Sequence, residues 1–387
     1  MTRTSHPVKW VACALVLLVA PPARAQAPVL HAGIEIGGKG VKATVVEVPA
    51  DPTKSPVTVK FTKTINTTIS DFDAGKFRPK AIAETVEAIT TLRTQIATDF
   101  RLNAATDITV VGSSGVALAS NRGELAAAVE KATGKTLEYI TVEREAELAL
   151  KGLILLGGQP DALLIDIGGG NTKGGVFADG KFVPYGIPLG TVTFSNKVKA
   201  AAAGRPFAEA ARALAADEVL KPLTAQAAPA MTDRKTVYAV GGVIWATATY
   251  AHPELADQPL VPLTAADVDA FLAKLAGGTL PELGVSGVAN EKVRSLASAD
   301  ANRIRANFTV EQLTAGATIL KAAFAAFKVE GKTAYFARNG VTAWIAAFVT
   351  PTAAPKAIAA GPVPIPACGA VGPRPFTPVP YFSYLQR

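Results

Sequence analysis

The sequence predicts an α/β protein in which two similar subdomains face each other across a cleft. Two observations carry this prediction. Strands and helices alternate along the chain, and alternation of this kind is typical of α/β folds. In addition, strands at 34–40 and 165–172 each carry a carboxylate near their end and run directly into a cluster of glycines. Two such turns far apart in one chain indicate a duplicated unit.

Short apolar or alternating runs bounded by turn residues predict the strands. They are expected within 29–49, as a pair around a glycine-rich turn, and at 57–64, 107–111, 162–167, 172–177, 181–184 and 236–240. Apolar residues at helical spacing predict the helices. They are expected at 79–100, with a proline at the start, at 124–133, 142–155 and 209–220, and directly after Gly242.

The composition of the chain excludes several classes of protein. The chain has 387 residues, of which 49% are hydrophobic and 18% charged, so it can build two domains with large cores and is not a disordered charged protein. Three histidines and two cysteines are too few for a zinc cage of the usual spacing or a disulfide scaffold. The same scarcity argues against a hydrolase with a Ser-His-Asp triad.

The N-terminus has the features of a secretory signal peptide over residues 1–25. Arg3 and Lys9 are followed by an apolar run at 10–20, which is too short to span a bilayer, and an Ala-x-Ala site ends at Ala25. We expect cleavage after Ala25 and a secreted or periplasmic protein without a stable membrane span. Cleavage removes three positive charges from a formal net charge of +8 and leaves +5.

The mature chain divides into three parts. We expect a first subdomain at 26–157 and a second at 158–350, whose last helix can pack back on the first. The remaining segment, 351–387, holds nine of the 27 prolines and is expected to be a flexible, proline-rich tail.

The glycine-rich turns suggest where an anion binds. Glycines after a strand allow backbone N–H groups to converge without a Cβ in the way, which creates a concave anion site. A carboxylate beside the turn can hold a hydrated divalent cation that bridges to phosphate oxygens. The candidate metal ligands are Glu35 and Asp166. The candidate phosphate-binding glycines are Gly37, Gly38, Gly168, Gly169, Gly170, Gly241 and Gly242.

A series of stretches between about residue 30 and residue 350 resembles the motifs of one protein family in order. They are GIEIGGKG at 33–40, VGSSGVALASN at 111–121, ITVEREAEL at 140–148, LIDIGGGNT at 164–172, GIPLGTV at 186–192 and VGGVIWA at 240–246. The chain thus resembles the exopolyphosphatase/guanosine pentaphosphatase (Ppx/GppA) family. The resemblance is most specific at 164–172 and 186–192.

The resemblance implies a fold and a chemistry. The fold would be two actin/ribonuclease-H-like subdomains, and the reaction would be Mg²⁺-assisted hydrolysis of the terminal phosphoanhydride bond of polyphosphate or a related phosphorylated anion. Glu145 would be the general base that activates water, and Asp166 would lie near the magnesium. The residues implied in phosphate binding are Gly168, Gly169, Gly170, Asn171, Thr172, Ser113 and Ser114.

Several residues depart from the family pattern. Glu35 replaces an aspartate, Lys173 replaces a glutamate, and Ala117 replaces an arginine that would contact phosphate. Lys39 and Lys173 each lie close to one glycine turn and are candidates for direct phosphate contact as point charges. The chain is therefore either a hydrolase or a polyanion-binding protein without catalytic activity.

Other partners are less well supported by the sequence. The first turn also suggests a sugar-kinase-like ATP phosphotransferase, which export disfavours. The lysines form no dense cluster interleaved with aromatic residues, so we expect no nucleic-acid binding. The sequence leaves open whether the chain forms a homodimer.

Overall fold

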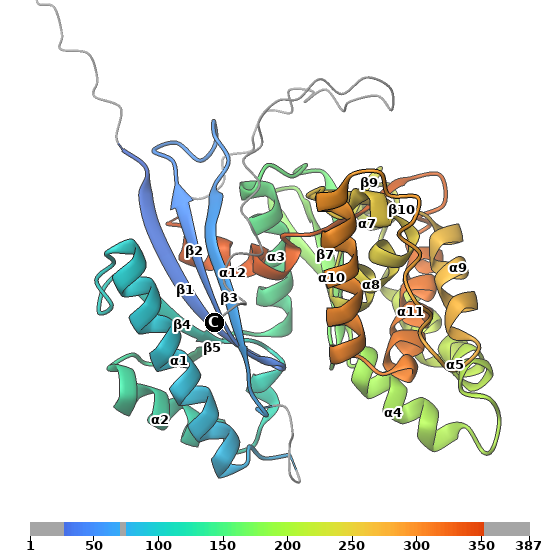
Figure 1. Cartoon of the computed structure of the whole chain (residues 1–387), viewed down its shortest axis with the longest axis horizontal. Coiled ribbons are helices and arrows are strands. Elements are labelled where there is room, and N and C mark those ends of the chain that lie inside the picture. The colour runs from blue at the N-terminus through green and yellow to red at the C-terminus, as the bar shows by residue number, and fades with distance from the viewer. Residues whose placement is uncertain (1–26, 70–74, 352–387) are drawn as a thin grey trace, which may run out of the picture.

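The computed structural model describes residues 27–69 and 75–351. The expected signal peptide (1–25) and, apart from residue 351, the expected proline-rich tail lie outside the described residues. Each half of the described chain contains one sheet with its own helices (Figure 1). Within the described ranges, no helix combines the length and the apolar character needed to cross a membrane.

The first sheet has the strand order β3-β2-β1-β4-β5. Its strands are β1 (Val29–Gly37), β2 (Gly40–Val48), β3 (Thr58–Asn66), β4 (Ile108–Gly112) and β5 (Glu138–Tyr139). The accompanying helices are α1 (Pro79–Phe100), the 3₁₀ turn Val116–Leu118, α2 (Arg122–Thr133) and α3 (Val142–Leu155). Strand β1 pairs antiparallel with β2 and parallel with β4, so the sheet is mixed.

The second sheet has the strand order β10-β11-β9-β6-β7-β8. Its strands are β6 (Ala162–Ile167), β7 (Thr172–Ala178), β8 (Lys181–Ile187), β9 (Thr236–Val240), β10 (Leu260–Leu263) and β11 (Thr333–Ala337). Its helices are α4 (Thr191–Ala201), α5 (Phe207–Ala215), α6 (Lys221–Gln226), α7 (Pro229–Thr232), α8 (Gly242–Ala251), α9 (Ala265–Leu275), α10 (Glu291–Asn307), α11 (Val310–Ala326) and α12 (Gly340–Val349), with a 3₁₀ turn at Pro253–Leu255.

The helix expected at 209–220 is longer and irregular. Between α5 and α6 the chain forms a π-helical segment, Ala216–Leu220, in which the N–H of Lys221 donates to the carbonyl of Ala216. Pro222 follows and has no N–H to donate to the preceding turn, which favours a local change of hydrogen-bond register.

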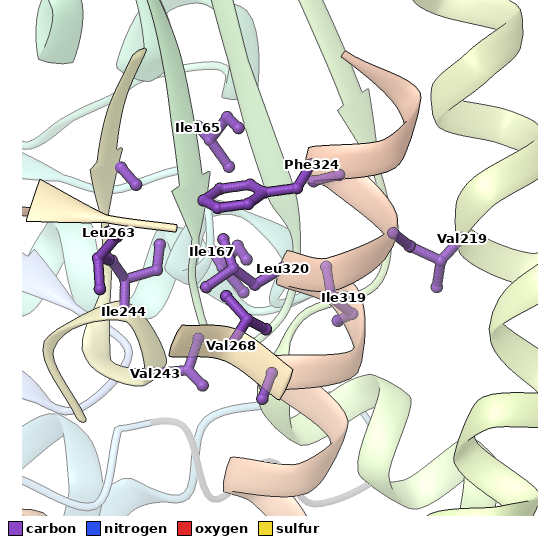
Figure 2. Close-up of a cluster of buried hydrophobic side chains, with 14 of the residues drawn as sticks. Ile165, Ile167, Val219, Val243, Ile244, Leu263, Val268, Ile319, Leu320 and Phe324 are labelled. Carbon is purple, nitrogen blue, oxygen red and sulfur yellow. The ribbon is translucent and has the colours of Figure 1, made fainter. Parts of the chain in front are cut away.

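Helix α11 packs against β6 and forms the core of the second subdomain (Figure 2). Ile165 and Ile167 of β6 lie against Leu320 and Phe324 of α11, and all four side chains are buried. Because side chains alternate along a strand, Asp166 between the two isoleucines must point to the opposite face of the sheet. The apolar pattern of β6 therefore directs this carboxylate away from the core.

Helices α3 and α12 pack together between the two sheets (Figure 1). Their backbones come very close at Gly152, where an added Cβ would lie 1.8 Å from the carbonyl oxygen of Ala343. Helix α12 belongs to the C-terminal half of the chain, yet it also covers β1, where an added Cβ on Gly33 would lie 2.6 Å from Ile345. This packing joins the two subdomains through the helices that border the candidate site.

Candidate functional site

Strand alternation brings the candidate carboxylates to the faces covered by α3 and α12. In β1, Ile34 and Ile36 enter the core of the first subdomain, so Glu35 points to the other face. Asp166 is placed in the same way in β6. Glu145 comes from α3, and the charges of Glu35, Glu145 and Asp166 are close enough to perturb one another. The structure thus gathers three carboxylates that the sequence analysis had named separately.

Lys173 lies at the centre of this carboxylate cluster and is 4% exposed. Its ammonium is 3.1 Å from Glu145 Oε1 and 3.1 Å from Asp166 Oδ2. It also donates to Asn171 Oδ1 at 3.2 Å. All three N–H donors of the ammonium therefore have an oxygen acceptor. Although burial opposes the charge, Asp166 and Glu145 raise the pKa of Lys173, so it stays protonated.

Lys42 holds the corresponding place in the first subdomain, and the sequence analysis missed it. Its ammonium is 3.4 Å from Glu35 Oε2 and donates to the carbonyl of Val341 at 2.9 Å. Lys42 is directly opposite Glu35 in the β1–β2 ladder, as Lys173 is opposite Asp166 in the β6–β7 ladder. The shared separation of seven residues between carboxylate and lysine was the available signal.

Glu145 is held from two sides. Thr141 caps the N-terminus of α3 by accepting from the N–H of Arg144, which places Glu145 in the first turn of the helix. The backbone N–H of Ser114 donates to Glu145 Oε2 at 2.8 Å, while Lys173 pairs with Oε1. Burial alone would raise the pKa of Glu145, but Lys173 and Ser114 lower it below the ordinary value. Glu145 is therefore ionised at neutral pH.

The other two carboxylates have the opposite shift. Burial raises the pKa of Asp166 in spite of Lys173, and the nearby charge of Glu145 adds to the increase. Burial also raises the pKa of Glu35 in spite of Lys42. Three carboxylates thus share two ammonium groups, and Glu145 is the one whose charged form is favoured most.

The glycine turn after β6 lies beside this cluster. The N–H of Gly168 donates to the carbonyl of Asn171, and the start of α4 packs against the turn. An added Cβ on Gly190 would lie 2.4 Å from the Gly168 carbonyl oxygen, whereas one on Gly170 would meet nothing within 4 Å. The outer side of the turn at Gly170 is therefore open, as a backbone anion site requires.

Three of the predicted phosphate-binding residues make contacts within the protein, Thr172 through its side chain and Ser113 and Ser114 through their backbone N–H groups. Thr172 is fully buried and its hydroxyl donates to the carbonyl of Leu189 at 2.8 Å. The N–H of Ser113 donates to the carbonyl of Ile36, which ties β4 to the end of β1. Ser114 contributes its N–H to Glu145, as described above. These residues shape the site, and the predicted phosphate contacts of Thr172 and Ser113 stay predictions.

Lys39, at the tip of the β1–β2 hairpin beside Gly37 and Gly38, reaches the second subdomain. Its ammonium donates to the carbonyl of Asn307 at 2.9 Å and lies 3.7 Å from the centre of the Phe308 ring. Burial lowers the pKa of Lys39. In this conformation Lys39 joins the two subdomains, and its predicted phosphate contact stays a prediction.

The third glycine pair occupies the turn from β9 into α8. Gly241 has a φ of +120°, and an added Cβ would lie 2.2 Å from the Ile167 carbonyl oxygen, so only glycine fits there. An added Cβ on Gly242 would lie 2.3 Å from the Phe308 ring. This pair brings the N-terminus of α8 close to the end of β6, and the first N–H groups of a helix favour anions.

The carboxylates do not form a metal centre as they stand. Within residues 27–69 and 75–351, no group of three or more His, Cys, Asp or Glu residues is arranged to hold a metal ion. Glu35 and Asp166, the predicted metal ligands, each have a lysine ammonium as their counter-ion. The Lys173 ammonium lies between Asp166 Oδ2, Glu145 Oε1 and Asn171 Oδ1, so a divalent cation does not fit between these oxygens without displacing it.

The fold and the site define an α/β protein with two subdomains whose carboxylates and glycine turns meet between them. The chain belongs to the Ppx/GppA phosphatase family, whose sequence profile matches residues 53–334. This confirms the family resemblance and the predicted fold class. A comparison with curated protein sequences gave no match.

Solved structures of family members have the same fold. A Ppx/GppA family member from Aquifex aeolicus aligns with a TM-score of 0.59 at 18% identity, covering 82% of this chain and 97% of its own. An exopolyphosphatase from Cytophaga hutchinsonii aligns with a TM-score of 0.57 at 15% identity, covering 83% of this chain and 99% of its own. At this level of identity the comparison establishes the fold, and the activity must be argued from the site.

Proposed function

We propose that this chain is an exported, exopolyphosphatase-like hydrolase that cleaves the terminal phosphoanhydride bond of polyphosphate or a related phosphorylated anion. Family membership supports the reaction class, and the features of residues 1–25 support export. The observation that carries the proposal is the placement of Glu145. It is an ionised carboxylate in a fixed orientation, and Lys173 bridges it to Asn171 of the open glycine turn.

Glu145 would act as the general base. A carboxylate held near phosphorus can take a proton from the attacking water, and such a group typically contributes about 10²–10⁴-fold to the rate. Backbone N–H groups of the glycine turn and of the α8 N-terminus would bind phosphoryl oxygens and stabilise their charge. Lys173 and Ser114 keep the carboxylate in position.

The divalent cation implied by the family does not fit this site as it stands. The oxygens of Glu145, Asp166 and Asn171 that would bind it already accept hydrogen bonds from the Lys173 ammonium. No step of the proposed reaction is therefore assigned to a metal. The positive charge near the carboxylates comes from the chain itself.

A second function, binding of polyphosphate without hydrolysis, is favoured by the same lysine. Both oxygens of Glu145 have donors, and its lowered pKa makes it a weaker base than an ordinary glutamate. Ala117, where the family has an arginine, adds no charge to the site. In this case the site would hold the anion without activating water.

Phosphate release from polyphosphate by the purified mature chain decides between the two functions. We expect release by the wild type and a decrease of about 10²–10⁴-fold in Glu145→Gln. Glu143→Gln is the matched control, because Glu143 lies in the same helical turn and is exposed. Binding measured by calorimetry without release supports the second function. Neither release nor binding contradicts both.

A further inference from the structure

The ammonium of Lys173 is surrounded by oxygen atoms in the way that a metal ion would be. Two carboxylate oxygens and one amide oxygen converge on it, from α3, from β6 and from the turn between β6 and β7. Carboxylate and amide oxygens are also the ligands that hard divalent cations take. The three distances of 3.1–3.2 Å suit N–H···O hydrogen bonds, whereas Mg²⁺ requires oxygens at about 2.0–2.1 Å.

The lysine has little freedom to leave this position. It is 4% exposed, and Asp166 lies directly opposite it in the β6–β7 ladder. Removing the ammonium would leave Glu145 and Asp166 buried without a counter-charge, and an unpaired buried charge is strongly destabilising. The pair Lys42–Glu35 repeats the arrangement in the first hairpin.

We infer that Lys173 permanently holds the place of a divalent cation, so that the wild-type site takes no Mg²⁺, and that removing this side chain opens a divalent-cation site. The ligands of that site are the oxygens of Glu145, Asp166 and Asn171. The inference concerns the site of the proposed function but does not require its reaction, because it is a statement about cation binding alone.

Two variants of Lys173 separate the loss of charge from the opening of space. Lys173→Ala removes the ammonium and vacates its volume, whereas Lys173→Met removes the ammonium and fills most of the same volume. We expect Mn²⁺, detected by its paramagnetic resonance signal, to bind Lys173→Ala and to be displaced by excess Mg²⁺. We expect no binding to the wild type or to Lys173→Met. Mg²⁺ should raise the Tm of Lys173→Ala only, and Asp166→Asn in that background should abolish both effects.

Two outcomes overturn the inference. One is Mn²⁺ binding to the wild type that Asp166→Asn abolishes. The other is an identical response of Lys173→Ala and Lys173→Met to Mn²⁺. If neither Lys173 variant folds, the Mn²⁺ titrations of the wild type and of Asp166→Asn still decide the first point, because both proteins keep Lys173. A wild type that releases no phosphate and binds no Mn²⁺ contradicts the proposed hydrolysis and leaves this inference in place.

Discussion

Lys173 lies directly opposite Asp166 in the β6–β7 ladder, with its ammonium 3.1 Å from the aspartate carboxylate. Lys42 has the same relation to Glu35 in the β1–β2 ladder. Residues opposite each other on neighbouring strands project to the same face of a sheet, so register alone brings each pair together. The duplicated hairpins therefore each carry a carboxylate together with its counter-ion, and Glu145 supplies the remaining negative charge.

The Lys42–Glu35 ion pair should contribute more to stability than an exposed ion pair with the same N···O distance. Removing one partner of a largely buried pair leaves a charge with little solvent to compensate it, so we expect Lys42→Met to lower the free energy of unfolding by about 3 kcal/mol. The double variant Glu35→Gln/Lys42→Met should recover most of this loss. Urea unfolding at neutral pH measures both.

The control for this prediction lies in the same sheet. Lys60 and Glu47 are also 3.4 Å apart, but their side chains are 40% and 36% exposed, against 19% and 11% for Lys42 and Glu35. Such surface pairs contribute less than about 1 kcal/mol, so Lys60→Met should have a small effect. Equal losses in Lys42→Met and Lys60→Met would contradict the idea that burial makes the first pair important.

Glu145 should make stability depend on pH in the acid range. Its pKa is lowered in the folded protein, so the folded state favours the ionised form relative to the unfolded chain. The resulting stabilisation is present above the ordinary glutamate value of 4.5 and is lost as the pH falls through the lower, folded-state pKa. The difference in unfolding free energy between the wild type and Glu145→Gln should therefore shrink in acid. Glu143→Gln, at an exposed position in the same helical turn, is the matched control. A difference that grew in acid would show that folding raises the pKa of Glu145 rather than lowering it.

The sequence predicted the elements whose pattern is local. Apolar residues at helical spacing and the proline at position 79 predicted α1, and the buried run at 162–167 predicted β6 with a carboxylate near its end. The structure brings Glu35, Glu145 and Asp166 together between the sheets, because each lies on an element whose other face is apolar.

The remaining features of the site depend on pairing between strands and subdomains. Lys42 was missed because its partner is set by the register of a hairpin, which motif comparison does not consider. The phosphate contact expected of Lys39 stays a prediction, and the partners that the structure gives it, Asn307 and Phe308, are far away in sequence. Lys173 was expected beside the anion. Asp166 is brought to it by the β6–β7 register, and Glu145 by the packing of α3 against β7.

The open side of the glycine turn can be tested by adding a single methyl group. Because a Cβ on Gly170 meets nothing within 4 Å, Gly170→Ala should leave the Tm nearly unchanged. If the backbone approaches phosphate there, the same methyl group should weaken polyphosphate binding about tenfold or more, as calorimetry would show. Unchanged affinity would place the anion elsewhere.

Gly152→Ala is the contrasting substitution. Its Cβ would lie 1.8 Å from the carbonyl oxygen of Ala343, so α3 and α12 must separate. Overpacking of this kind typically destabilises by about 1–3 kcal/mol. A drop in Tm with Gly152→Ala but not with Gly170→Ala would show that the two glycines have different roles, the first in helix packing and the second in the site.

Lys39 should control the contact between the hairpin tip and the second subdomain. Its ammonium contacts both the Asn307 carbonyl and the Phe308 ring, and a cation over an aromatic ring contributes about 0.5–2 kcal/mol. We expect Lys39→Met to speed amide hydrogen exchange at the β1–β2 turn and at the start of α11 while the cores keep their protection. Lys39→Arg should retain most of the protection, because the guanidinium can still stack on the ring. Phe308→Leu should reproduce the effect of Lys39→Met, and combining the two should add little. Exchange that is unaffected by either substitution would show that this contact does not hold the subdomains together.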